Sequence, residues 1–166
     1  MEELDREVLS DFDALWARVQ PGYTPREPSA PAQASPQDDM QELRRMIDQT
    51  AAAAQAMKAL AAKTPCYASR LCALACARFA MARQLQGAYY LLTGERHACG
   101  ASCSVRHAPC ECLRCVWQTS RTQRTWAQRA AECTDEPLLK TLYAELVDLL
   151  DEQSESLRCM LTDLLG

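Results

Sequence analysis

The chain has 166 residues, a formal net charge of −4 and a pI near 5.2. That length suffices for one domain with a hydrophobic core, and Lys and Arg are scattered among acids, so we expect no nucleic-acid partner. No stretch approaches the roughly 20 apolar residues of a membrane helix, so we expect no membrane partner. The acidic N-terminus lacks the apolar segment of a signal peptide. These features predict a cytoplasmic location, in which the ten cysteines remain reduced.

Residues 1–19 are predicted to form an amphipathic helix, because Leu4, Val8, Phe12 and Trp16 recur at helical spacing. Residues 20–35 contain four prolines and several small polar residues, which is typical of a linker. We therefore expect a tethered helix that lies in a groove of a protein partner or of a second copy in a homodimer.

The body, residues 36–166, is predicted to be all-α. Ser35-Pro36 is typical of a helix start, Thr64-Pro65 of a break and Gly94 of a helix end. Apolar residues recur at helical rather than alternating spacing, which predicts helices at about 36–63, 65–93, 109–133 and 136–165. Four helices of this length predict an up-down four-helix bundle.

The apolar spacing also predicts which residues face the interior. On the first helix these are Leu43, Met46 or Ile47, Thr50, Ala54, Met57 and Leu60. On the second they are Leu71, Leu74, Arg78, Met81, Leu85, Ala88 and Leu92. On the third they are Cys112, Cys115, Thr119, Thr122, Trp126, Arg129 and Cys133. On the fourth they are Leu139, Leu142, Leu146, Leu149 or Leu150, Gln153, Leu157, Met160 and Leu164.

Two strings in the body resemble a known family. LQGAYYLLTGERH (85–97) and WAQRAAECTDEPLLKTLYAEL (126–146) are similar to the rubrerythrin-related ferritin-like proteins of anaerobic spore-forming bacteria. The resemblance covers about residues 36–166. It implies a ferritin-like bundle with a crossover between the second and third helices, and a di-iron site held by two single glutamates and two Glu-x-x-His pairs.

Carried onto this chain, none of the six expected iron ligands remains. The corresponding positions read Thr50, Arg78, Met81, Thr119, Leu150 and Gln153. A guanidinium has no lone pair to offer and its positive charge opposes an iron pair, so we do not expect a di-iron cofactor. We expect Arg78 either to reach a bundle edge or to pair with Gln153 and the threonines, because a buried unpaired charge is costly.

The segment 97–115 concentrates both histidines and five cysteines of the chain. Its candidate metal ligands are His97, Cys99, Cys103, His107, Cys110, Cys112 and Cys115. Thiolates and imidazoles at short spacing suit Zn or Cu(I). The alternative is a set of thiols without metal, because a crossover that spans a helix has little length left to wrap an ion. Elsewhere, Cys72, Cys76, Cys133 and Cys159 are interpreted as packing residues.

The sequence therefore favours a non-enzymatic, degenerate ferritin-like bundle that acts as an interaction or structural protein, with Zn or Cu(I) at 97–115 as the cofactor to test. The alternative is a metal-dependent oxidoreductase of the rubrerythrin-like peroxidase type, or a thiolate metal-storage protein.

Overall fold

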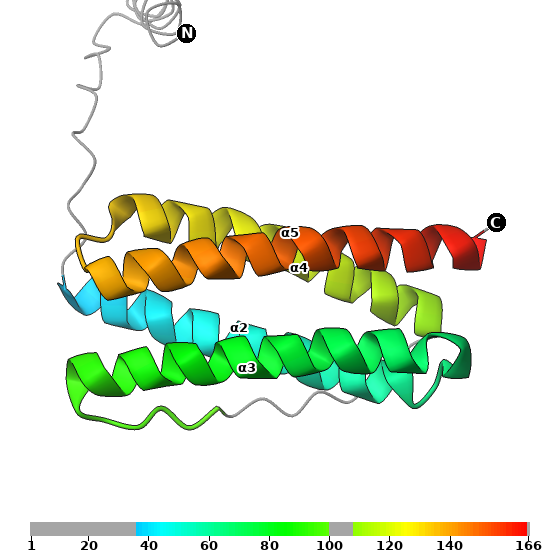
Figure 1. The fold of residues 1–166 in the computed structure, drawn as a ribbon, viewed down its shortest axis with the longest axis horizontal. Helices are drawn as coiled ribbons and strands as arrows, with labels where there is room; N and C mark the ends of the chain where they lie inside the picture. The colour runs from blue at the N-terminus through cyan, green and yellow to red at the C-terminus, as the bar shows by residue number, and fades with distance from the viewer. Residues whose placement is uncertain (1–35, 100–107, 166) are drawn as a thin grey trace, which may run out of the picture. The chain divides into compact units, whose positions relative to one another are not determined.

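The computed structural model describes residues 36–99 and 108–165, and every regular element in them is helical, as the sequence predicts. Four long helices pack together: α2 (Pro36–Ala61), α3 (Ala68–Thr93), α4 (Pro109–Cys133) and α5 (Pro137–Leu165) (Figure 1). A single turn of 3-10 helix, η1 (Pro65–Tyr67), precedes α3. None of the described helices is long and apolar enough to cross a membrane. The predicted N-terminal helix and linker, 1–35, lie outside the described residues.

The helix ends follow from local sequence. Asp38 and Asp39 lie in the first turn of α2, where carboxylates favour the helix dipole. The turn after α2 is held by Thr64, whose hydroxyl donates to the carbonyl of Leu60 at 2.8 Å. Gly94 ends α3 in the left-handed conformation, with φ of 74°, and its N–H donates to the carbonyl of Tyr90 at 2.8 Å.

The four helices form two antiparallel hairpins, α2–α3 and α4–α5 (Figure 1). Thr134, just after α4, donates a hydrogen bond to Asp39 at the start of α2, at 3.0 Å. Glu95, just after α3, lies 3.8 Å from Arg44 near the same end. Because α3 and α4 both finish there, they run parallel, and α3 ends and α4 begins at opposite ends of the bundle.

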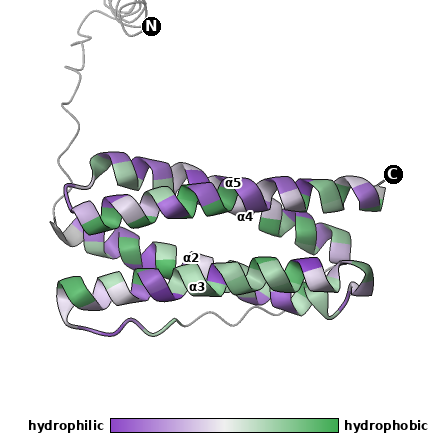
Figure 2. Ribbon diagram, viewed as in Figure 1, coloured by the Kyte–Doolittle hydropathy of each residue, from purple (hydrophilic) through white to green (hydrophobic). Residues whose placement is uncertain are grey.

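The core consists of two apolar clusters, one in each half of the bundle. Both are built from all four helices, each of which alternates hydrophobic and hydrophilic residues along its length (Figure 2). The first includes Leu43, Met46, Ile47, Met81, Leu85, Ala88, Tyr89, Ala127, Leu139, Leu142, Tyr143, Leu146 and Leu150. The second includes Ala53, Met57, Leu60, Ala61, Leu71, Ala75, Leu113, Val116, Leu157, Met160 and Leu161.

A layer of buried polar side chains separates the two clusters along every helix. We call it the polar layer; its members are Thr50, Arg78, Ser120, Gln123 and Gln153. On each helix, the residues before its member belong to one cluster and those after it to the other. The bundle therefore has two apolar cores with one polar layer between them.

The predicted inward faces of α2, α3 and α5 agree with the observed burial over most of their length. Of the two choices left open on α5, Leu150 is fully buried and Leu149 lies at the margin of the first cluster. At the helix ends the prediction was wrong, because Leu92 and Leu164 are 37% and 40% exposed.

The inward face predicted for α4 was wrong by one residue. Cys115, Thr119, Thr122, Arg129 and Cys133 are exposed, and Cys112 and Trp126 are only partly buried. The buried residues of α4 are Leu113, Val116, Ser120, Gln123 and Ala127. The physical reason is that this helix has few large apolar residues, and one of them, Trp126, is covered on the surface by Arg45, whose Cζ lies 3.5 Å from the ring centroid.

The corrected face of α4 can be tested with a pair of alanine substitutions. Leu113→Ala removes a side chain that is 2% exposed and should lower the free energy of unfolding by about 2–5 kcal/mol. Cys115→Ala, the matched control at a predicted inward position, should change it by less than about 0.5 kcal/mol. Urea denaturation measures both, and a larger effect at Cys115 would restore the original face.

Candidate functional site

The centre of the polar layer is Arg78, whose side chain is fully buried in the middle of the bundle. Its Nε donates to Oε1 of Gln153 on α5 at 2.5 Å. Its Nη1 donates to Oε1 of Gln123 at 2.8 Å, and its Nη2 donates to Oγ of Ser120 at 2.8 Å, both on α4. One guanidinium therefore bonds to side chains of two other helices.

The partners of Arg78 are themselves held in place. The amide of Gln123 donates to Oγ1 of Thr50 on α2 at 2.7 Å, which brings the fourth helix into the network. The amide of Gln153 donates to the carbonyl of Leu74 at 3.1 Å. The hydroxyls of Thr50 and Ser120 donate to backbone carbonyls one turn earlier on their own helices. The network is thus anchored to the backbone on several sides, which fixes its geometry.

The positive charge of Arg78 is stabilised by hydrogen bonds to neutral amide and hydroxyl oxygens. Among the described residues, no carboxylate lies within ion-pair distance of this guanidinium. Burial lowers the pKa of Arg78 to about 10, so the side chain remains protonated near neutral pH. A buried cation with no counter-ion is costly, and hydrogen bonds to amide and hydroxyl oxygens must offset that cost.

The structure brings together only some of the six positions that the resemblance aligns with iron ligands. Thr50, Arg78 and Gln153 lie in the polar layer, and the expected pairing of Arg78 with Gln153 is observed. The expected pairing with the threonines is not, because no threonine bonds to Arg78 and Thr50 joins the network only through Gln123. The alternative expectation, that the Arg78 side chain reaches an edge of the bundle, was wrong, because this side chain is fully buried. Thr119 is exposed, and Ser120 and Gln123 occupy the interior in its place. Met81 and Leu150 pack in the first cluster.

This donor set does not fit an iron pair. Carboxylates and imidazoles are the ligands that such a centre needs, and the polar layer supplies two amides, two hydroxyls and a guanidinium. The amide and hydroxyl oxygens already accept or donate hydrogen bonds within the layer. The sequence analysis did not identify Gln123 and Ser120 as interior residues. Placing the inward face of α4 one residue further along the helix would have identified them.

His97 and Cys99, two of the predicted metal ligands, lie against α2 and α3. His97 Nε2 is 2.9 Å from Oδ1 of Asp48 on α2, and the His97 ring packs against Tyr89 with centroids 5.9 Å apart. Gln86 on α3 donates to Cys99 Sγ at 3.2 Å. Burial first, and the charge of Asp48 second, raise the pKa of the Cys99 thiol, so this cysteine is a poorer source of thiolate than an exposed one.

The other predicted ligands lie elsewhere or outside the described residues. Cys110 and Cys112 pack against the second cluster, whereas Cys99 packs against the first, so the structure does not bring these two sets together. Cys115 is exposed on α4. Cys103 and His107 fall within 100–107, outside the described residues, so the seven-ligand site stays a prediction. In the described part of the chain, no three His, Cys, Asp or Glu side chains are placed to hold one metal ion.

The remaining cysteines are more exposed than predicted. Cys72, Cys76 and Cys133 are exposed rather than packed in the core, and Cys159 is partly exposed. Relative to the polar layer, seven of the nine cysteines in the described residues lie in the half of the bundle that holds the second cluster: Cys66, Cys72, Cys76, Cys110, Cys112, Cys115 and Cys159. Thiols are therefore concentrated at one half of the molecule.

Comparison of the chain with known proteins does not assign it to a family. No family model matches the chain, and neither a curated protein nor a solved structure is detectably similar to it.

The cooperativity of the polar layer can be measured with a double-mutant cycle. Arg78→Met leaves the oxygens of Gln123, Gln153 and Ser120 without their buried donor, and should lower the free energy of unfolding by about 2–5 kcal/mol. Gln153→Leu should cost less in the Arg78→Met background than in the native chain, with a coupling energy of about 1–3 kcal/mol. Urea denaturation of the four proteins gives the cycle, and additive effects would show that the network is not a unit.

The pH dependence of the Arg78→Met effect distinguishes neutral partners from a carboxylate. Burial lowers the folded-state pKa of Arg78 to about 10, below the ordinary value of an arginine, so the side chain is protonated in both states between pH 6 and 9 and its contribution should be constant. Above pH 10 the folded chain loses the proton first, so the cost of the buried charge should fall and stability relative to the variant should rise. A contribution that declines below pH 5 would reveal a carboxylate partner.

The raised pKa of Cys99 has a consequence for its reactivity. At pH 8, alkylation by iodoacetamide should be slower at Cys99 than at the exposed Cys133, because less thiolate is present. Asp48→Asn removes a neighbouring negative charge and should accelerate the reaction at Cys99 by roughly two- to ten-fold. Asp135→Asn, at an exposed site, is the matched control and should leave the rate unchanged. Mass spectrometry of the alkylated peptides gives the rates; equal rates at Cys99 and Cys133 would contradict this account.

Proposed function

We propose that the chain is a non-enzymatic, degenerate member of the ferritin-like bundles that acts as an interaction or structural protein. The observation that carries the proposal is the polar layer, in which the guanidinium of Arg78 and its neutral partners fill the centre of the bundle. These groups offer neither a general base nor iron ligands, and they serve to hold four helices in one register.

The topology supports the ferritin-like part of this proposal. The two antiparallel hairpins and the long connection between parallel α3 and α4 agree with the crossover that the family resemblance implies.

Exposed apolar side chains at the end of α3 support a role in interaction. Leu91 is 74% exposed and Tyr90 is 51% exposed, and they are adjacent in the chain. Large apolar groups exposed at the same end of a helix are candidates for a contact surface. The predicted amphipathic helix at 1–19, our other candidate for partner binding or for a homodimer contact, lies outside the described residues.

A second candidate function, soft-metal binding, is favoured by the concentration of thiols in one half of the bundle. Cys110 and Cys112 lie at the start of α4, directly after the segment that contains Cys103 and His107. That short stretch supplies enough thiolate and imidazole ligands for Zn or Cu(I). In this case Cys99 and His97 would not participate, because they lie against the first cluster.

Metal analysis separates the two functions and the rubrerythrin-like alternative. Protein purified anaerobically without a metal-binding tag and then incubated with Fe(II) should retain no stoichiometric iron by elemental analysis, because the polar layer lacks iron ligands. Stoichiometric iron, or peroxide consumption that depends on it, would contradict the leading proposal.

The same preparation tests the thiol site with Zn²⁺. If soft-metal binding is the function, about one zinc per chain should bind with loss of titratable thiols, and a double variant Cys110→Ser, Cys112→Ser should abolish uptake. Cys133→Ser, at the opposite end of α4, is the matched control and should bind zinc normally. No zinc uptake and a full count of titratable thiols would leave the structural and interaction role alone.

A further inference from the structure

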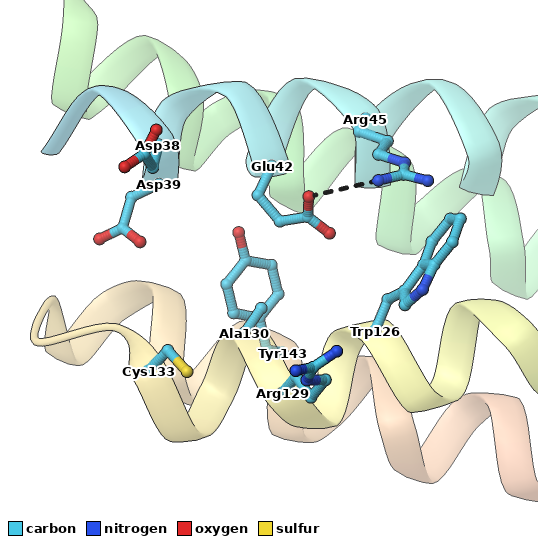
Figure 3. Close-up of a pocket in the computed structure, with 9 residues that line it drawn as sticks. All are labelled: Asp38, Asp39, Glu42, Arg45, Trp126, Arg129, Ala130, Cys133 and Tyr143. Atoms are coloured by element: carbon cyan, nitrogen blue, oxygen red, sulfur yellow. Dashed lines mark ion pairs between the residues drawn. The ribbon is translucent and has the colours of Figure 1, made fainter. Parts of the chain in front are cut away.

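A cavity lies at the end of the bundle where α2 begins, α4 ends and α5 begins. Its volume is about 330 Å³. Asp38, Asp39, Glu42 and Arg45 line it from α2, Trp126, Arg129, Ala130 and Cys133 from α4, and Tyr143 from α5 (Figure 3). Three carboxylates and two guanidiniums leave this wall with one net negative charge near neutral pH.

Tyr143 provides a second, independent observation on this cavity. The side chain is 1% exposed, yet its hydroxyl has no hydrogen-bond partner among the described residues. Two other buried polar atoms of the described residues lack a partner, in Gln49 and Ser154, but both belong to residues that are partly exposed. Figure 3 shows the Tyr143 hydroxyl pointing toward α2, into the gap between Asp39 and Glu42. A buried hydroxyl without a partner costs about 1–3 kcal/mol.

The neighbours of this hydroxyl determine which ligand would satisfy it. Burial raises the pKa of Tyr143, and the charges of Glu42 and Asp39 raise it further, so the hydroxyl faces negative potential. Arg45 offsets this negative potential only in part. Its guanidinium lies 3.8 Å from the carboxylate of Glu42, and its Cζ lies 3.5 Å from the centroid of the Trp126 ring, on which it stacks. Asp39 accepts a hydrogen bond from Thr134 at 3.0 Å, an interaction that leaves its charge in place.

We propose that this cavity binds a small organic cation through a primary alkylammonium group. The ammonium would donate hydrogen bonds to Tyr143 Oη and to the carboxylates of Asp39 and Glu42, and its alkyl chain would lie along Ala130 and Trp126. One positive charge matches the one net negative charge of the wall. Because the Tyr143 oxygen is covered in the absence of ligand, entry requires the side chain of Glu42, which is one-third exposed, to turn aside.

An ammonium fits this site better than a metal ion does. A hard cation requires several oxygen ligands at 2–2.6 Å around one point, and no three carboxylate, thiol or imidazole groups of the described residues are so arranged. An ammonium accepts a looser, three-directional arrangement of acceptors. The face of the Trp126 ring is already covered by Arg45, so the ionic contacts and the phenol carry the binding.

The test is a titration of the ¹⁵N-labelled chain of 166 residues with n-butylammonium, read from the indole N–H signals of its three tryptophans. The Trp126 signal should shift and saturate, and the Trp117 signal should not move, because Trp117 packs against the second cluster. The neutral isostere 1-butanol and the ion Mg²⁺ should leave the Trp126 signal in place.

Two variants and a control test whether the Trp126 response depends on Tyr143 and Glu42. Tyr143→Phe should weaken butylammonium binding about ten-fold or more, as expected for loss of a hydrogen bond to a charged group, without lowering the thermal midpoint, because the lost hydroxyl had no partner. Glu42→Gln should also weaken binding, and Glu145→Gln, an exposed carboxylate on α5, should not.

Several outcomes would overturn the proposal. Equal shifts with 1-butanol would show an apolar cavity without charge recognition, and a response to Mg²⁺ alone would show a metal site. Unchanged affinity in Tyr143→Phe would remove the phenol from the site. An absent Trp126 response together with a lower midpoint in Tyr143→Phe would show that the hydroxyl is structural, bonded to Asp39 or Glu42 after a small rotation.

Discussion

The burial of one positive charge among neutral oxygens is the constraint on which this bundle depends. Arg78 can be tolerated in the interior only while α4 and α5 present Ser120, Gln123 and Gln153 at the right height and angle. A slide of either helix by one turn would carry an apolar side chain to the guanidinium and leave several donors unsatisfied. Apolar packing alone tolerates such slides far better, because Leu and Ala contacts are not directional. The polar layer thus contributes more to a unique register than to net stability.

The same layer decides what the centre of the molecule can do. A four-helix bundle with carboxylates and histidines at its centre can hold metals and activate oxygen, whereas a guanidinium, two amides and two hydroxyls do not supply the ligands for such a centre. The groups on which our ligand-binding proposals rest lie away from the polar layer. Thiols are concentrated in one half, and the acidic cavity with its unpaired phenol lies at the end of the other half. The two proposals for ligand binding rest on these separate regions, so either can fail without the other.

Much of the fold follows from the sequence because apolar residues recur at helical spacing. On α2, for example, Leu43, Ile47, Ala54 and Met57 share one side and are all buried. The inward face of α4 was nevertheless misplaced, since cysteine, threonine and alanine suit an interior or an exposed position almost equally well. Its true face includes Ser120 and Gln123, which local reasoning assigns to the surface; they are inside because Arg78, 42 and 45 residues earlier in the chain, bonds to them.

The candidate sites were less predictable than the fold, for a related reason. The pairing of Arg78 with Gln153 could be foreseen, since two polar residues on inward faces need each other. The acidic cavity could not, because Tyr143 reads as an ordinary core aromatic and the carboxylates near it lie on another helix. For segment 97–115, spacing along the chain suggested proximity, but the crossover places Cys99 against one cluster and Cys110 against the other. Closeness in sequence does not imply closeness in space when the connection runs the length of a bundle.

The division of the core into two clusters also has a consequence for motion. Apolar cooperativity is carried by contact between apolar groups, and here the contact is interrupted on all four helices at the same height. We therefore expect each half to open locally as a unit, with the polar layer as the boundary between the two units. Opening of the half around Leu71 and Leu113 would uncover Cys110 and Cys112 while the half around Leu85 and Leu146 stays closed. The accessibility of Cys110 and Cys112, unlike that of the already exposed Cys66, Cys72, Cys76 and Cys115, would then report opening of this half rather than global unfolding.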